Sequence, residues 1–356
     1  MTTLDLSQDA ALLTAALVDV YSESGHETQV ADAVEVALRG LTGVVVERNG
    51  DAVVARTELG RSSRVVLAGH LDTVPPADNL PSRRDGDTLF GLGSADMKSG
   101  LAVMLRLAAT ITEPIHDVTF IFYDGEEVEA ERNGLLRLSR ADPAQLVADF
   151  AVLLEPTDAV IEGGCQGTMR IDVTAAGVRA HSARSWMGQN AIHEAAHILD
   201  RLRSYEPRTP NVDGLNFREG LNAVGVRGGV AGNALPDECV VTVNYRFAPD
   251  RDEAEAEAHM RELFIGFDVV VTDSAPGARP GLDQEAAKSF VGAIGGEPRA
   301  KFGWTDVALF SALGVPAVNY GPGDPHVAHT RDEWVSTTQI RECETRLSNW
   351  LIGLAG

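Results

Sequence analysis

Cysteine is scarce in this chain of 356 residues. Three cysteines occur, Cys165, Cys239 and Cys343, without a C-x-x-C pair, which argues against a disulfide framework and against a zinc site built from cysteines. A nucleophilic Cys165 is an alternative, but the sequence places no recognisable base beside it. We therefore expect a metal site, if the chain has one, to use other ligands.

Long hydrophobic runs and an excess of basic residues are also missing. No stretch approaches the roughly 20 apolar residues of a membrane-spanning helix, and residues 1–9 lack the basic start and apolar core of an export signal. Arginine and lysine number 30 against 52 aspartates and glutamates, which gives a net charge of -22. This acidity disfavours nucleic acid and anionic membranes as partners. We expect a cytoplasmic protein that acts on a small molecule.

An apolar run at residues 65–68 ends in Gly69-His70-Leu71-Asp72. Positions i and i+2 of a strand point to the same side, so His70 and Asp72 are expected to lie together. The acid would then hydrogen-bond the far ring nitrogen and fix the tautomer that binds a metal. The alternative is an ordinary polar strand end.

Two further acidic motifs follow at the ends of predicted elements. Asp96 lies in GLGSADMKSG, just before an apolar helix, where the alternative is a helix N-cap. The strand at residues 118–123 ends in Asp124-Gly125-Glu126-Glu127. Because adjacent side chains diverge, one acid can bind a cation while its neighbour takes a proton from water. A solvated acidic turn is the alternative here.

Later apolar runs end in Glu155 and, after residues 317–320, in a segment that contains His326 and His329. Strand ends are where an open α/β sheet builds its sites. A mixed nitrogen and oxygen donor set without cysteine fits zinc, cobalt or manganese, and five protein ligands on two zinc ions leave room for water and substrate. The candidate metal ligands are His70, Asp96, Glu127, Glu155 and His329.

The motifs GHLDTVP, GLGSADMKSG, Glu126-Glu127, LLEPT and AHTRDE resemble the dinuclear zinc aminoacylase and carboxypeptidase family, through nearly the whole chain and in the family's order. The segments EPTDAVIEGGCQGT, RAHSARSWMGQNAI, GNALPDECVVTVNYRFAPD and FGWTDVALF are most similar to its actinobacterial desuccinylases. This resemblance implies hydrolysis of N-succinyl-LL-2,6-diaminopimelate in lysine and diaminopimelate synthesis. The alternatives are an acetylornithine-type deacetylase or carboxypeptidase, and a non-catalytic metal-dependent binding protein.

The resemblance also implies a role for each residue of the metal centre. It places His70 and Glu155 on one metal ion, His329 and Glu127 on the other, and Asp96 as the bridge between them. Glu126 becomes the general base and Asp72 the acid that orients its neighbours. His326, three residues before His329, is the alternative ligand.

Substrate binding is expected from a second group of polar residues. In the family that this chain resembles, a histidine equivalent to His181 stabilises the oxyanion, often across a dimer interface. The alternative for His181 is an ordinary surface histidine. The alternative for Arg246 is a salt bridge on the sheet face. One departure is that Cys165-Gln166 stands where some desuccinylases have two arginines. The candidate substrate contacts are His181, Arg184, Asn233, Arg246, Gly303 and Thr305.

Hydrophobic periodicity predicts two kinds of sheet. Strands alternating with helices predict a mixed, largely parallel α/β sheet flanked by helices, formed by a discontinuous catalytic domain at 1–167 and 280–356. Polar and apolar residues alternate between 168 and 279, which predicts an inserted lid domain with an antiparallel sheet and two helices. The family resemblance implies a homodimer through this lid.

Overall fold

A computed structural model describes residues 3–354 of the chain. The chain divides into two compact units: a large unit, Met1–Gly163 with Gly281–Arg299 and Leu309–Gly356, and a small unit, Gly164–Pro280 with Ala300–Ala308. The sequence placed residues 300–308 in the catalytic domain. The structure differs there because Gln166 and Gly303 of the small unit are joined by a backbone hydrogen bond of 2.9 Å.

The large unit contains a sheet with the strand order β1-β2-β6-β3-β7-β18-β8-β17. Its central strands β6, β3, β7 and β18 are parallel, whereas β1, β2 and β8 pair antiparallel with their neighbours. The bounds are β1 (Val44–Asn49), β2 (Ala52–Thr57), β3 (Arg64–His70), β6 (Asp117–Tyr123), β7 (Phe150–Leu153), β8 (Glu162–Gly163), β17 (Arg299–Ala300) and β18 (Ala317–Asn319).

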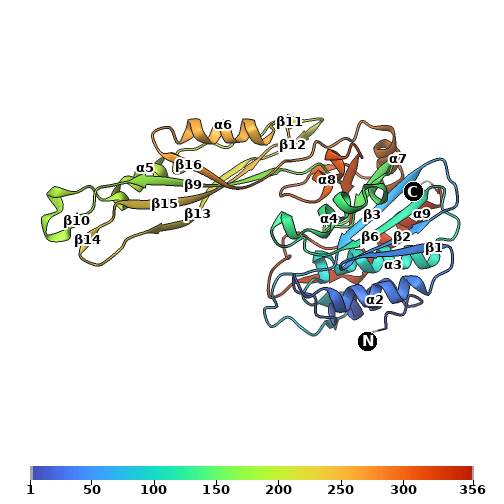
Figure 1. Ribbon diagram of the computed structural model, residues 1–356. Helices are drawn as coiled ribbons and strands as arrows, with labels where there is room; N and C mark the ends of the chain where they lie inside the picture. The colour runs from blue at the N-terminus through green and yellow to red at the C-terminus, as the bar shows by residue number, and fades with distance from the viewer. Residues whose placement is uncertain (1–2, 355–356) are drawn as a thin grey trace. The chain divides into compact units, whose positions relative to one another are not determined.

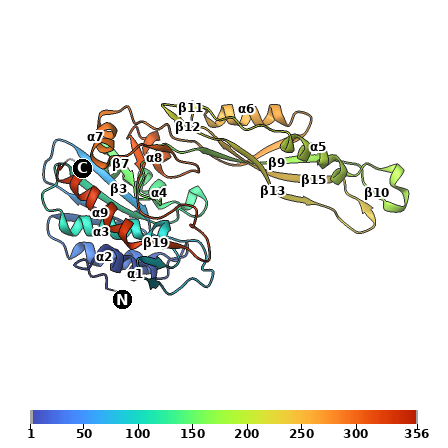
Figure 2. The ribbon, with the colours of Figure 1, turned by 180° about the vertical axis from the view of Figure 1, so that it is seen from behind.

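The central strands are buried along almost their whole length because helices cover both faces of the sheet. Residues of α1, α2, α3, α7 and α9 share one hydrophobic core with one face of the strands, and α4 lies on the opposite face from α2 and α3 (Figures 1 and 2). The bounds are α1 (Ala10–Val18), α2 (Thr28–Arg39), α3 (Ser99–Thr110), α4 (Gly134–Ala141), α7 (Glu285–Ile294), α8 (Val307–Ala312) and α9 (Thr337–Leu351).

Three short strands and several tight helical turns complete the large unit. The strands form a sheet of order β19-β5-β4, in which Trp334 pairs with Phe90. This pairing brings the segment just before residue 334 beside the loop just after residue 90. The bounds are β4 (Arg83–Asp85), β5 (Thr88–Phe90), β19 (Trp334–Ser336), η1 (Ser94–Lys98), η2 (Ala130–Arg132) and η3 (Pro143–Leu146).

The small unit is built on an antiparallel sheet of order β13-β15-β9-β16. Buried and half-exposed residues alternate along β15 and β9, and the buried ones pack against α5 and α6. The bounds are β9 (Gly167–Ala176), β10 (Ala180–His181), β11 (Asn211–Val212), β12 (Leu215–Asn216), β13 (Gly220–Gly228), β14 (Ala234–Leu235), β15 (Glu238–Phe247), β16 (Asp268–Ala275), α5 (Ala191–Arg203), α6 (Glu253–Leu263) and η4 (Ser182–Met187).

The predicted fold class is confirmed: a mixed, largely parallel sheet with flanking helices, and an antiparallel sheet with two helices. None of the helices within residues 3–354 is long and apolar enough to cross a membrane.

Candidate metal centre

The candidate ligands follow neighbouring parallel strands at the edge where those strands end. His70 is the last residue of β3 and pairs with Tyr123 at the end of β6, three residues before Glu126. On the other side of β3, Ala68 pairs with Leu153 of β7, two residues before Glu155. The sheet register therefore places these residues at the same edge of the sheet, where the parallel strands end.

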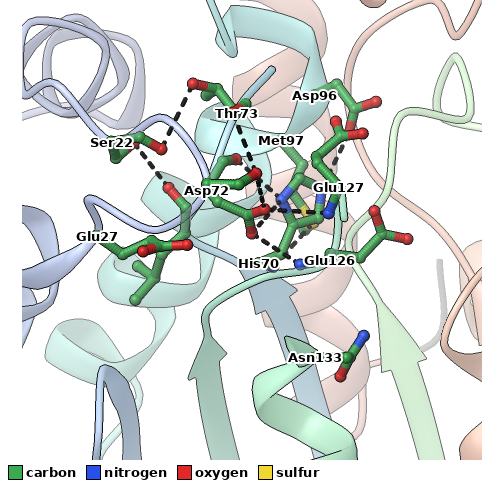
Figure 3. A network of polar contacts seen from close by, with 12 residues as sticks. Ser22, Glu27, His70, Asp72, Thr73, Asp96, Met97, Glu126, Glu127 and Asn133 are labelled. Carbon is green, nitrogen blue, oxygen red and sulfur yellow. Dashed lines mark hydrogen bonds and ion pairs between the residues drawn. The ribbon is translucent and has the colours of Figure 1, made fainter. Parts of the chain in front are cut away.

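Four of the five predicted ligands form a compact cluster of imidazoles and carboxylates. Nε2 of His70 lies 3.2 Å from Oδ1 of Asp96, and Nε2 of His329 lies 3.5 Å from Oδ2 of the same carboxylate. Oε1 of Glu127 is 2.7 Å from Nε2 of His329. The two oxygens of Asp96 thus face different imidazoles, which is the arrangement expected of a bridging carboxylate. Figure 3 shows His70, Asp96 and Glu127 turned toward one another.

Glu155 is the fifth predicted ligand, and it lies buried beside this cluster. It is 5 % exposed, and its charge is one of those that raise the pKa of His70. The structure therefore brings Glu155 to the His70 side of the cluster and Glu127 to the His329 side.

Proton affinities in the cluster are strongly shifted. Burial alone would lower the pKa of His70, but hydrogen bonds to Asp72 and Asp96 outweigh burial and raise it well above its usual value. Hydrogen bonds that the ring of His329 donates to the carboxylates of Asp96 and Glu127 raise the pKa of His329 to about 10. Burial opposes ionisation of Asp96, yet hydrogen bonds from the two histidines hold the pKa of its carboxyl well below the ordinary range. Such paired shifts are typical of functional sites.

Asp72 contacts both sides of this site, through its backbone carbonyl as well as through the predicted carboxylate. Nδ1 of His70 faces the backbone carbonyl of Asp72 at 3.0 Å, while the carboxylate lies farther away at 3.5 Å. The carboxylate accepts the backbone N–H groups of Glu126 and Glu127 at 3.0 Å each, and the hydroxyl of Ser24 at 2.7 Å. These contacts leave Nε2 of His70 facing the cluster and fix the turn that carries both glutamates.

The segment around Asp96 is not the helix cap that was the alternative. Helix α3 begins at Ser99, and Asp96 has extended backbone angles of -117° and 96°. A Cβ atom at Gly100 would lie 2.3 Å from the carbonyl oxygen of Leu154, so glycine is required for the close approach of α3 to the end of β7. This contact holds the Asp96 segment against the strand that precedes Glu155.

The structure separates the two candidate histidines. His329 joins the cluster, whereas the His326 side chain is 88 % exposed and its Nδ1 contacts Oδ1 of Asp324 at 2.7 Å. We expect His329→Ala to reduce the bound metal, because it removes an imidazole that faces both Asp96 and Glu127. His326→Ala should leave the metal content unchanged. Elemental analysis of the two purified variants checks this, and the opposite pattern would reverse the assignment.

The candidate substrate contacts lie in the small unit, in two groups near opposite ends of strand β9. His181 pairs with Ala234, next to Asn233, and Arg184 follows in η4. Arg246 pairs with Thr168 at the opposite end of β15, close in sequence to Gln166, which bonds Gly303. Strand β9 advances eight residues from Thr168, the partner of Arg246, to Ala176, which corresponds to roughly 26 Å. His181 follows Ala176 by five residues, in β10. The structure therefore does not bring the six candidates into one cluster within the small unit.

The His181 ring is held in one tautomer. Its Nδ1 accepts the backbone N–H of Ala183 at 3.0 Å, so in the neutral ring Nε2 carries the proton. The side chain is exposed. A neutral imidazole in this tautomer presents a hydrogen-bond donor outward, as an oxyanion contact requires.

Arg246 does not form the sheet-face salt bridge that was its alternative. Among the described residues no carboxylate lies within ion-pair distance of its guanidinium, whereas the nearby Arg170 pairs with Asp273 at 3.8 Å. Burial lowers the pKa of Arg246. Its strand neighbours Tyr245 and Phe247 point into the helix-covered core, so Arg246 lies on the opposite face of the sheet.

Cys165 and Gln166 are turned toward neighbouring loops. The Cys165 thiol is buried beside the carbonyl of Thr305, and burial raises its pKa to about 11. The Gln166 side chain accepts the N–H of Gly303 at 3.2 Å and donates to the carbonyl of Arg218 at 2.6 Å. Gln166 therefore holds loops in place rather than supplying a cation for the substrate.

We expect iodoacetamide at neutral pH to leave Cys165 unmodified in the folded protein, because the reactive thiolate is scarce and buried. Mass spectrometry of the treated protein, with the urea-unfolded protein as control, checks this. Rapid alkylation of Cys165 with loss of activity would revive the nucleophile alternative.

Comparison with known proteins identifies the family. The sequence profile of Peptidase family M20/M25/M40 matches residues 66–351. The chain belongs to this family of metallopeptidases. As a member of the M20 family it is 50 % identical to a succinyl-diaminopimelate desuccinylase of Corynebacterium glutamicum, over 98 % of this chain and 97 % of that protein.

A second relative agrees with this membership, and a solved structure shares the fold. A Mycobacterium tuberculosis protein provisionally named for the same activity is 57 % identical over 98 % of this chain and 100 % of its own. A tripeptidase from Staphylococcus aureus shares the fold, with a TM-score of 0.79 at 22 % identity over 99 % of both chains. The M20 relatives confirm the expectation of a metal-dependent hydrolase.

Proposed function

We propose that this M20 enzyme hydrolyses N-succinyl-LL-2,6-diaminopimelate to succinate and LL-2,6-diaminopimelate. The observation that carries the proposal is the cluster of His70, Asp96, Glu127 and His329, with Glu126 held beside it by Asp72. The 50 % sequence identity to a desuccinylase, over 98 % of this chain, supports the choice of substrate within the family. The product amine would serve lysine and diaminopimelate synthesis.

The donor set fits two zinc ions, with cobalt or manganese as substitutes. Imidazole nitrogens and carboxylate oxygens without thiolates suit these metals. We assign His70 and Glu155 to one ion, His329 and Glu127 to the other, and Asp96 to both, because its two oxygens face different imidazoles. When bound, the pair of ions polarises the amide carbonyl and lowers the pKa of water at the site.

Glu126 is the proposed general base. Its backbone N–H is fixed to Oδ1 of Asp72 at 3.0 Å, and Figure 3 shows its carboxylate directed away from Asp72. Glu127, the next residue, turns instead toward His329. The two adjacent carboxylates thus point in different directions, and Glu126 would take a proton from the attacking water and deliver it to the departing amine.

We propose that the polar residues of the small unit bind the rest of the substrate. His181, with its Nε2–H exposed, would donate to the oxyanion that forms at the scissile carbonyl. Arg246, without a carboxylate partner among the described residues, would take the succinyl carboxylate. Arg184, Asn233, Gly303 and Thr305 are the remaining proposed contacts.

A homodimer through the small unit accounts for the separation of these residues. Strand β9 runs roughly 26 Å from Thr168, the partner of Arg246, to Ala176, and His181 lies beyond that end in β10. We infer that one small substrate does not touch both His181 and Arg246 of the same chain. Strand β13 is an edge strand, and edge strands present unpaired backbone groups. Val224 and Val226 on β13 are each 60 % exposed, which offers an apolar surface to a second copy.

Light scattering tests this assembly. We expect a particle of twice the 37.9 kDa chain mass, and Val226→Lys should shift it toward the single chain with loss of turnover. A single chain with full activity at all concentrations would contradict the dimer.

We further propose that the enzyme works in the cytoplasm. Its cysteines are free thiols, as is usual in a reducing compartment, and its proposed substrate is a biosynthetic intermediate. Neither nucleic acid nor a membrane is proposed as a partner, because the net charge of -22 disfavours both.

The activity test uses the zinc-loaded full-length protein. We expect it to release succinate from N-succinyl-LL-2,6-diaminopimelate. The free amine formed in the reaction is assayed to follow turnover. If the enzyme cleaved N-acetylornithine or a peptide and not the succinylated substrate, its activity would be that of a deacetylase or a peptidase of the M20 family. Zinc binding without cleavage of any of the three would favour a non-catalytic binding protein.

A further inference from the structure

Glu333 is a buried carboxylate that contacts the backbone of the Asp96 loop. It is 1 % exposed. Oε1 of Glu333 accepts the N–H groups of Ala95 and Asp96 at 2.9 and 3.0 Å, and Oε2 accepts the N–H of Gly93 at 2.9 Å. Both oxygens are therefore used, and one of the donors is the backbone of a candidate metal ligand.

The backbone around Glu333 is joined to the same loop. The carbonyl of Glu333 accepts the N–H of Gly91 at 3.1 Å, and the next residue, Trp334, pairs with Phe90. The side chain of Lys98 is buried nearby, and its Nζ donates to the carbonyl of Val20 at 2.8 Å. A buried carboxylate with these partners is costly to replace, because its donors would be left unsatisfied.

Glu333 follows His329 by four residues, so one short segment carries a candidate ligand and also holds the loop that carries another. We propose that Glu333 is a positioning residue for the metal centre, which fixes the backbone of Asp96 so that its two oxygens face His70 and His329 before metal binds. This inference deepens the proposed function and rests on it. Groups behind the ligands commonly set metal affinity in this way.

The test compares Glu333→Gln with Asp117→Asn. Glutamine keeps the shape of Glu333, but whichever way its amide turns, an NH2 group meets an N–H donor. Asp117 is a matched control because it is also a buried carboxylate, 5 % exposed, that accepts the N–H groups of Leu59 and Arg61. It lies at the start of β6, at the opposite end of the strand from Glu126 and Glu127.

Calorimetric titration of the metal-free proteins with Zn²⁺ is the measurement. We expect Glu333→Gln to weaken Zn²⁺ binding by about 10- to 100-fold, the usual effect of losing a group behind a metal ligand, while Asp117→Asn binds like the unmodified protein. Equal affinities in all three proteins would overturn the role of Glu333 and leave the metal centre intact. Failure of the unmodified protein to bind Zn²⁺ would overturn the proposed function as well.

Hydrogen exchange in the unmodified protein provides a second measurement that does not depend on the folding of a variant. We expect the amides of Gly93, Ala95 and Asp96 to exchange slowly in the metal-free protein, because the buried carboxylate of Glu333 already accepts their hydrogen bonds. Exchange at the rate of an open loop, with protection only after Zn²⁺ is added, would show that the metal rather than Glu333 orders the loop, and would overturn the inference.

Discussion

Glu126→Gln is expected to lower kcat by about 10²- to 10⁴-fold, the usual contribution of a general base, and to leave both metals bound. The amide of glutamine preserves the shape of the side chain but cannot accept the proton of the attacking water. The backbone bond from residue 126 to Asp72 would remain, because it does not use the side chain. Kinetics and elemental analysis of the same preparation provide the measurement.

The matched control is Glu129→Gln, the same chemical change at an exposed residue of the same segment. We expect it to retain the kcat of the unmodified enzyme. If Glu126→Gln retained near-native kcat with metals bound, Glu126 would not be the base. If it lost turnover together with metal, the residue would instead belong to the metal centre.

The separation of base and ligand depends on the geometry of one turn. Glu126 and Glu127 both donate their N–H groups to the Asp72 carboxylate, one to each oxygen. Burial opposes the charge on Asp72, but hydrogen bonds and the charge of His70 outweigh it and lower the pKa of Asp72 to about 2. Asp72 therefore stays ionised while it fixes the turn, which explains how adjacent residues take different roles.

The strands that carry the metal centre were readable from the sequence because they are continuous apolar runs. β3, β6 and β7 are buried on both faces, and their burial leaves a simple hydrophobic signal. Strand β13 is harder to recognise in the sequence, for the opposite reason. It is a largely exposed edge strand with a register shift between Ala223 and Gly225, so its residues do not alternate regularly.

The candidate ligands could be predicted because each follows an apolar strand or a distinctive loop motif. The residues that hold these ligands in place could not be predicted. Glu333 reaches Asp96 across 237 residues, and Ser24 reaches Asp72 across 48. Such contacts depend on tertiary packing, which leaves no periodic signal in a single sequence. Nδ1 of His70 faces the backbone carbonyl of Asp72 as well as the predicted carboxylate, because strand alternation gives the side of the sheet but not which oxygen of the residue lies nearer.

Charge pairing predicts the selectivity of the enzyme for its acyl group. A succinyl group ends in a carboxylate that an acetyl group lacks, and a site built to pair a buried charge rejects the analogue without it by up to about 10⁴-fold. We expect kcat/KM for N-succinyl-LL-2,6-diaminopimelate to exceed that for N-acetylornithine by a factor of this order. Competition kinetics with both substrates provides the measurement.

Arg246→Ala should remove most of this selectivity, because Arg246 has no carboxylate partner among the described residues and its charge is therefore available to the substrate. Arg170→Ala is the matched control: it removes the same charge from the same sheet, but Arg170 already pairs with Asp273. We expect Arg246→Ala to lower kcat/KM for the succinylated substrate with metal content unchanged, and Arg170→Ala to preserve it. Equal losses of kcat/KM in both variants would show that Arg246 contributes only positive charge to the surroundings and does not contact the succinyl carboxylate. Unchanged selectivity in Arg246→Ala would place that carboxylate on Arg184 or Thr305 instead.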